Sequence, residues 1–450
     1  MWPKALRSRI VAAVVLTCGA GCPGLEESLI RGDVDGTQRL SESDAGGEPQ
    51  VLTADGGPVD QPVSKLDVLF VIDNSGSMAS KQARLMREVA RMIAIFTSGD
   101  KYAGSTRGLP AGLTDKQRLF TPVSSLHVGV VSSNAGGIDN PPSNQVAIRS
   151  CGGTGDDGKL QNSTSIAAGG VIANRNEFQG KNAGDVVISN DPSCALPPQP
   201  VYQSFVTTDD PGVLAHTLSC VARLGVRGCP FEQPLESMWK ALAPSQGVSA
   251  TDPQFKFVNG SLGQGDRENQ GFLREDAVLT VVILSDEDDC SVTDAGKVMF
   301  ATGGPEGAEA DAKYGALNLR CGLNASDASL VQPISRFVNG LRSLKPGHPE
   351  RLVVTAIVGV PQEAVRAGLS YPEILALPAM QFHEHAETVG FPATTCSNVD
   401  QTEVAYGGRR YVQLADALGA QAVVESICED DYGGVVDRMI DKVAPMIGRQ

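Results

Sequence analysis

The residues whose types and spacing could bind a ligand form a short polar segment after an apolar run. Residues 66–72 are apolar and rich in β-branched side chains, which predicts a strand buried on both faces. The next five residues, 73–77, read Asp-Asn-Ser-Gly-Ser. Their spacing can direct the Asp73 carboxylate and the Ser75 and Ser77 hydroxyls toward one point. Because only oxygen donors are present, the segment predicts a site for Mg²⁺ or another hard divalent cation.

A second group of carboxylates follows the strongest predicted strand. Residues 277–285 are almost entirely aliphatic, and the four residues after them, 286–289, are all acidic. Consecutive carboxylates raise one another's pKa, and a bound cation would relieve that repulsion. The alternative is a solvated acidic turn, which is the interpretation we favour for Asp288 and Asp289.

The segment at residues 73–77 resembles the metal-ion-dependent adhesion site of von Willebrand factor A domains and integrin I domains. Its flanks match as well, because a predicted strand precedes it and residues 82–96 have helical periodicity. The resemblance covers residues 63–450. It implies an α/β fold with a doubly wound, mostly parallel sheet flanked by helices. It also implies that Asp286 contacts the ion, directly or through a water molecule.

One loop departs from the family pattern. In A domains a threonine at the start of a later helix supplies a further hydroxyl, but here the polar residues before Pro234 are Glu232 and Gln233. Glu232 as a ligand would add negative charge and would favour Ca²⁺ or Mn²⁺ over Mg²⁺. Alternatively, the site is degenerate.

The N-terminus predicts export. Residues 1–22 have a basic start and an apolar stretch too short to span a bilayer, and they resemble a bacterial lipoprotein signal. Cys22 is the preferred lipidation site because an even number of cysteines follows it, and Cys18 is the alternative. An ordinary secreted protein is the other possibility. The acidic, Gly- and Ser-rich residues 23–62 predict a disordered linker.

The remaining cysteines predict disulfides. No C-x-x-C pair occurs among them, and in an exported protein four bridges are the economical interpretation. We expect them to fix loop insertions at about residues 138–208 and 292–329. By the resemblance, Cys229 and Cys290 lie near the two outer metal loops, so a bridge between them is a further hypothesis. The candidates are Cys151, Cys194, Cys220, Cys229, Cys290, Cys321, Cys396 and Cys428.

The resemblance implies a metal-ion-dependent module that binds a protein or matrix ligand through the ligand's acidic side chain. As a lipoprotein it would be anchored to the bacterial cell envelope, at the outer membrane or cell surface, touching the membrane only through its lipid. A structural or assembly lipoprotein with a degenerate metal site is the alternative. The formal charge of −15 excludes nucleic acid as a favoured partner. No nucleophile or phosphate-loop motif indicates an enzyme, so we discount a metal-dependent hydrolase.

Overall fold

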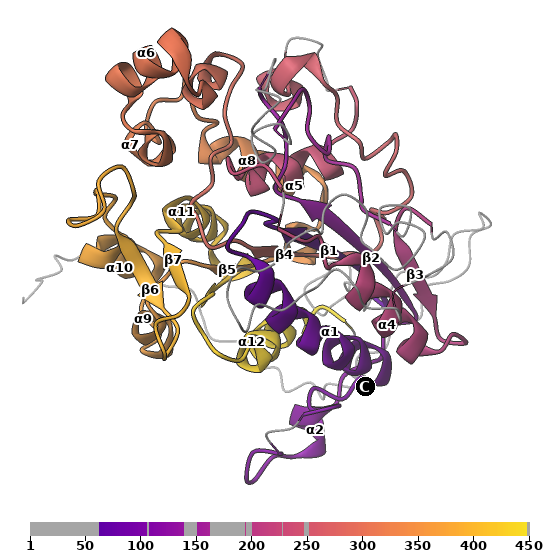
Figure 1. Cartoon of the computed structure of the whole chain (residues 1–450). Coiled ribbons are helices and arrows are strands. Elements are labelled where there is room, and N and C mark those ends of the chain that lie inside the picture. Colours follow the sequence, from indigo (N-terminus) through magenta and orange to yellow (C-terminus); the bar gives the residue numbers. More distant parts are fainter. Residues whose placement is uncertain are drawn as a thin grey trace, which may run out of the picture. The chain divides into compact units, whose positions relative to one another are not determined.

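A six-stranded sheet forms the centre of the protein (Figure 1). The computed structural model describes residues 63–105, 108–138, 151–162, 194, 200–226, 228–246 and 252–447. The strand order is β3-β2-β1-β4-β5-β8, and all neighbours are parallel except β3, which runs antiparallel to β2 at one edge. The predicted α/β class and mostly parallel sheet are thus confirmed. The strands are β1 (Lys65–Ile72), β2 (Ser125–Ser132), β3 (Gln203–Val206), β4 (Val278–Leu284), β5 (Leu352–Val358) and β8 (Ala422–Ser426).

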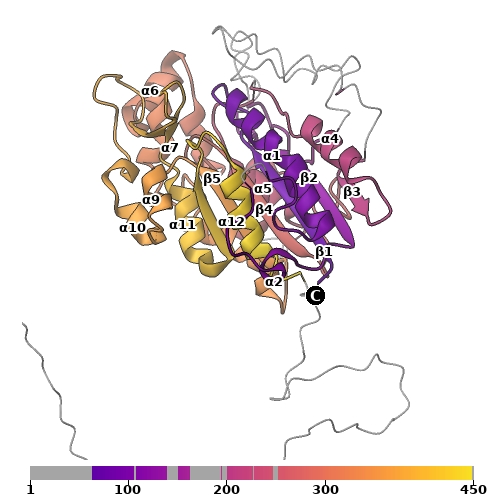
Figure 2. The ribbon, with the colours of Figure 1, turned by 90° about the horizontal axis from the view of Figure 1, so that it is seen from below.

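Helices cover both faces of this sheet, which explains why its strands are continuously apolar. Along β1, Phe70 packs into the core on one face and Leu69 and Val71 pack into the core on the other. Figure 1 shows one layer of helices above the sheet and one below it, and Figure 2 shows the lower layer from its outer side. The upper layer contains α5 (Pro234–Leu242), α8 (Ile334–Ser343) and α11 (Arg409–Leu418), and the lower contains α1 (Ala79–Ser98), α4 (Pro211–Val221) and α12 (Gly433–Val443).

Several elements lie where the sequence predicts irregular structure. Strand β3 falls within the insertion expected at residues 138–208, and residues 292–329 contain α6 (Gly304–Tyr314) and the short α7 (Arg320–Leu323). An antiparallel hairpin of β6 (Thr394–Ser397) and β7 (Val404–Tyr406) forms a second, small sheet. The remaining short helices are α2 (Asp115–Arg118), α9 (Gln362–Arg366) and α10 (Tyr371–Ala376).

The described residues contain four disulfides, which confirms the number predicted for these eight cysteines. They join Cys151 to Cys229, Cys194 to Cys220, Cys290 to Cys321, and Cys396 to Cys428. The hypothesis of a Cys229–Cys290 bridge is therefore wrong. Both cysteines do lie in one small apolar cluster, but each pairs with a cysteine of the insertion beside it. The bridges consequently fasten the insertions to the rim of the sheet instead of cross-linking the two predicted metal loops.

The predicted signal peptide, with Cys18 and Cys22, and the predicted linker at residues 23–62 lie outside the described residues. Within the part of the chain that the structure describes, no helix is both long enough and apolar enough to cross a membrane.

Candidate metal centre

The order of the strands reverses between β1 and β4, so the loops that leave these two strands diverge from one point. Open α/β sheets bind ligands in the crevice at such a point, at the carboxyl ends of the strands. Asp73 directly follows β1, and Asp286 lies two residues beyond β4. The backbone N–H of Asp73 donates to the carbonyl oxygen of Leu284 over 2.9 Å. The structure therefore brings the two predicted acidic loops together.

The Asp73 carboxylate is buried and held by two hydrogen bonds. Its Oδ1 accepts from the backbone N–H of Ser75 at 2.8 Å, and its Oδ2 accepts from the hydroxyl of Ser285 at 2.9 Å. Burial, together with the nearby charge of Asp286, raises the pKa of Asp73 to about 7. A carboxylate fixed in this way and short of positive charge is suited to a cation.

Asp286 is also buried, and the chain itself supplies a positive charge to it. The ammonium Nζ of Lys81, in the first turn of α1, lies 2.6 Å from Asp286 Oδ2 and 3.1 Å from the carbonyl oxygen of Ser77. The other carboxylate oxygen, Oδ1, and the Ser75 hydroxyl are buried and have no hydrogen-bond partner among the described residues. These two oxygens have unused lone pairs at the place where the sequence predicts ligands. Ser77 itself is exposed.

Two further carboxyl groups face the same crevice. Burial raises the pKa of Glu232 well above its usual range, and the charges of Glu287, Asp73 and Asp286 raise it further. Burial and the charges of Asp286 and Asp73 raise the pKa of Glu287 to about 8, while Lys81 opposes this effect. Glu232 was a predicted candidate ligand. Glu287 was visible only as part of the acidic run, without a signal that separated it from its neighbours.

Asp288 and Asp289 do not form the solvated turn that we favoured. Asp289 is buried, and its Oδ2 lies 3.0 Å from Nε of Arg410 in α11. Its Oδ1 accepts from the backbone N–H of Leu235 at 2.9 Å. Asp288 accepts from the backbone N–H of Arg410 at 2.9 Å. These carboxylates hold the loop against α5 and α11.

The second predicted loop also lies beside this crevice. The backbone N–H of Gly228 donates to the carbonyl oxygen of Asn74 at 2.7 Å, and that of Cys290 donates to the carbonyl oxygen of Glu232 at 2.8 Å. Gln233 is committed elsewhere, because its amide donates to Gly136 and accepts from the N–H of Val292. Of the two polar side chains before Pro234, only Glu232 is close enough to the carboxylates for their charges to raise its pKa.

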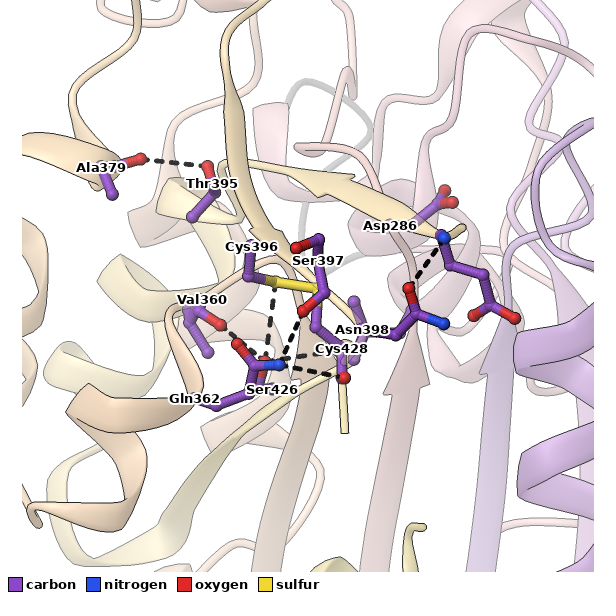
Figure 3. Close-up of a disulfide and its surroundings, with 12 residues drawn as sticks. Asp286, Val360, Gln362, Ala379, Thr395, Cys396, Ser397, Asn398, Ser426 and Cys428 are labelled. Atoms are coloured by element: carbon purple, nitrogen blue, oxygen red, sulfur yellow. Dashed lines mark hydrogen bonds between the residues drawn. A yellow bond between two sulfur atoms is a disulfide. The ribbon is translucent and has the colours of Figure 1, made fainter. Parts of the chain in front are cut away.

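The β6–β7 hairpin forms the remaining wall. The backbone N–H of Tyr406 donates to the carbonyl oxygen of Asp286 at 2.8 Å, and Glu403 pairs with Arg84 of α1 at 2.9 Å. The disulfide between Cys396 and Cys428 ties the hairpin to the chain after β8, as Figure 3 shows. Sequence reasoning missed this support, because the two contacts join segments far apart in the chain.

Gln362 reinforces the same junction. Its side-chain amide donates to the carbonyl oxygens of Ser397, at 2.8 Å, and Cys428, at 3.1 Å (Figure 3). The hairpin is thus fastened along β6, while Tyr406 of β7 contacts the Asp286 loop and Glu403 in the turn contacts α1. Beside the carboxylates a cavity of about 50 Å³ remains, lined by both acidic and apolar side chains, including Glu232, Glu287, Phe382 and Tyr406.

The donor set fits a hard cation better than a transition metal. Among the described residues, no three His, Cys, Asp or Glu side chains are grouped so as to hold a metal ion. The site suggested by the sequence would instead combine Asp73 and Asp286 with the Ser75 hydroxyl, and all of these groups offer oxygen.

Comparison with models of protein families and with curated proteins finds no match to this chain. The assignment of the site therefore depends on the sequence pattern and on the geometry described above.

Proposed function

We propose that residues 63–450 form a metal-ion-dependent protein-binding module of the von Willebrand factor A type. Asp73, Ser75 and Asp286 would hold the ion, with Ser77 and Glu232 completing the ligand set. When bound, the ion supplies positive charge at the rim and an open position for the acidic side chain of a protein or matrix partner. Mg²⁺ is the expected ion, and a Glu232 ligand would favour Ca²⁺ or Mn²⁺.

One observation carries this proposal. The loops after β1 and β4 meet where the strand order reverses, and there Asp286 Oδ1 is buried without a hydrogen-bond partner among the described residues. Unpaired buried oxygens cost free energy, which a cation would recover. The raised pKa values of Asp73 and Glu287 indicate the same shortage of positive charge.

The test is a calorimetric titration of the purified full-length protein with Mg²⁺, Ca²⁺ and Mn²⁺. We expect one ion per chain, and we expect Asp73→Asn to weaken binding by a factor of at least about 100. Asp276→Asn is the matched control, because Asp276 is an exposed carboxylate that pairs with Lys65 at the other end of β1. Equal affinity in the two variants would show that the ion does not bind at Asp73.

A second measurement addresses the open position. Bound Mn²⁺ that keeps a water ligand enhances the relaxation of solvent protons, and acetate is the smallest probe for a partner's carboxylate. We expect acetate to reduce the enhancement in the wild type. No reduction at saturating acetate would argue against capture of an acidic side chain.

The alternative is a structural or assembly component of the envelope whose metal site is degenerate. The Lys81–Asp286 ion pair and the missing threonine favour it. A wild-type protein that binds none of the three ions, yet is folded, would support this alternative.

We also propose that the protein is exported and lipid-anchored to the bacterial envelope through Cys22, with Cys18 as the alternative. Metabolic labelling with a radioactive fatty acid tests this. Label should disappear in Cys22→Ala and persist in Cys18→Ala. The reverse pattern would reassign the anchor, and an unlabelled wild type would indicate ordinary secretion.

A further inference from the structure

We propose that Lys81 is an internal cation that competes with the divalent ion for Asp286, and that it thereby sets the affinity of the site. This inference rests on the proposed function, because it concerns the same site. Lys81 joins the two loops that the ion would join: its ammonium contacts Asp286 after β4 and the carbonyl oxygen of Ser77 in the loop after β1. The ammonium thus forms a hydrogen bond with Oδ2 of Asp286, which is a predicted metal ligand.

The burial of this pair distinguishes it from an ordinary surface salt bridge. The side chains of Lys81 and Asp286 are 3% and 1% exposed. Bringing two charges out of water is costly, and the cost is recovered only when both charges are fully paired. Here the pairing is incomplete, because Asp286 Oδ1 has no hydrogen-bond partner among the described residues. A purely structural pair would not require an unsatisfied oxygen beside it.

The place of Lys81 on its helix points the same way. It is the third residue of α1, where the positive end of the helix dipole disfavours a cation. The acidic loop supplies the compensation, because Lys81 pairs directly with Asp286, and the charge of Asp286 is close enough to raise the pKa of both Asp73 and Glu287. The negative charge of the carboxylates therefore outweighs the helix dipole at Lys81. The same negative charge would attract a divalent cation.

An ammonium and a divalent ion at the same carboxylate repel each other strongly where water is excluded. Binding of the ion would therefore displace the Lys81 ammonium. The flexible four-carbon stem of lysine allows it to move without a change in the helix. Removing the charge of Lys81 removes the competitor, while exchanging it for another cation does not.

The experiment compares wild type, Lys81→Met and Lys81→Arg as full-length proteins in Mg²⁺ and Mn²⁺ titrations. Lys81→Met keeps an apolar stem of similar length, and Lys81→Arg keeps the charge. We expect Lys81→Met to bind the ions at least about tenfold more tightly than wild type, to be less heat-stable in EDTA, and to gain more stability on adding Mg²⁺. Lys81→Arg should remain within a few fold of wild type.

The outcomes separate this inference from the proposed function. If wild type binds an ion and Lys81→Met binds it equally or more weakly, the competition is refuted and the proposed function stands. If neither binds, both fail. If Lys81→Met alone binds, the competition is supported. Should Lys81→Met be unfolded in EDTA, refolding on addition of Mg²⁺ supports competition and failure to refold refutes it.

A second readout reports displacement directly. Acetylation with a lysine-selective reagent, followed by mass spectrometry, should modify Lys81 several-fold faster in saturating Mg²⁺ than in EDTA. Lys313 is an exposed reference whose reactivity should not change. Continued protection of Lys81 while the ion is bound would show that the ammonium and the ion coexist, which overturns the proposal.

Discussion

Because the carboxyls of the acidic loops have raised pKa values, we expect the metal-free protein to lose stability as the pH rises through neutrality. The pKa is about 7 for Asp73 and Asp288 and about 8 for Glu287, chiefly because of burial. In the unfolded chain such carboxyls ionise at much lower pH. The folded state therefore binds more protons near pH 7, so the free energy of unfolding falls as the pH increases. The stability is fully present below the unfolded pKa values and is lost as the pH passes the folded ones.

The interval from about pH 6.5 to 7.5 spans the pKa values of these groups. Burial also raises the pKa values of Glu232, Glu236 and Glu425, whose contributions have the same sign. Burial lowers the pKa of His127 below its usual 6.5, so its contribution has the opposite sign and offsets a small part of the decline until the imidazole of the unfolded chain has lost its proton. Burial lowers the pKa of Lys345 to about 8, so its contribution, also opposite in sign, arises mainly above the interval. Across this unit a carboxyl with a folded pKa near 7 loses roughly 0.7 kcal/mol, and one near 8 loses roughly 1.2. The pKa of about 8 for Glu287 already includes the effect of the Asp73 charge, so for Asp73, Asp288 and Glu287 together we expect a loss of roughly 2–3 kcal/mol across the interval.

The assay is urea unfolding in EDTA at several pH values within this interval. Asp73→Asn should flatten the decline, because it removes one titrating group and one of the charges that raise the pKa of Glu287. Saturating Mg²⁺ should remove the decline in the wild type, since a cation binds the ionised carboxylates. Stability that is constant or rises with pH in EDTA would refute the reasoning, because it would mean that the carboxyls are already ionised in the folded protein.

Three further predictions concern the frame around the site. Replacing both Cys396 and Cys428 by alanine opens a loop with a sequence separation of 32 residues; we expect a loss of roughly 3–4 kcal/mol in chemical unfolding, and an unchanged midpoint would contradict the role of this bridge. Glu236→Gln breaks a buried pair with Arg336 at 3.0 Å and should cost roughly 3–5 kcal/mol. The double variant with methionine at both positions should recover most of that loss, and no recovery would show that packing dominates. At Gly359 a Cβ would lie 1.8 Å from a backbone oxygen of β7, so Gly359→Ala should cost at least roughly 1–3 kcal/mol and weaken ion binding in calorimetry; wild-type affinity would separate the hairpin from the site.

The central strands were predictable because each is a long apolar run that ends at polar residues. Strands β1 and β4 lie within one residue of the bounds predicted at residues 66–72 and 277–285. Strands β3 and β8 were missed for a different reason. Both are short edge strands; β3 lies in a Gly- and Pro-rich region, and β8 directly follows a helix and a turn. A short edge strand pairs with one neighbour only, and its sequence does not contain the long apolar run by which a central strand is recognised.

The loops of the candidate site were predictable, but their counter-charges were not. Asp73 and Asp286 follow the strands that topology places side by side, so their location could be inferred from the strands alone. Lys81 and Arg410 contact their carboxylates across 205 and 121 residues of sequence. A pattern within a short stretch of sequence cannot predict a contact between residues so far apart. The sequence alone could not give the disulfide pairing for the same reason, since eight cysteines allow 105 connectivities.

The charges of the site decide whether it can attract an acidic partner. If Asp73, Asp286, Glu232 and Glu287 were all ionised, a divalent ion would leave the crevice with a net negative charge even with Lys81 beside it. A partner's carboxylate would then be repelled. The raised pKa values of Glu232 and Glu287 change this balance, because a protonated glutamic acid still offers an oxygen but carries no charge. With only Asp73 and Asp286 ionised, the ion neutralises the ligands and Lys81, displaced but nearby, leaves the rim positive. In the proposed site, a glutamate at position 232 is thus compatible with capture of a carboxylate only if it is neutral when the ion is bound.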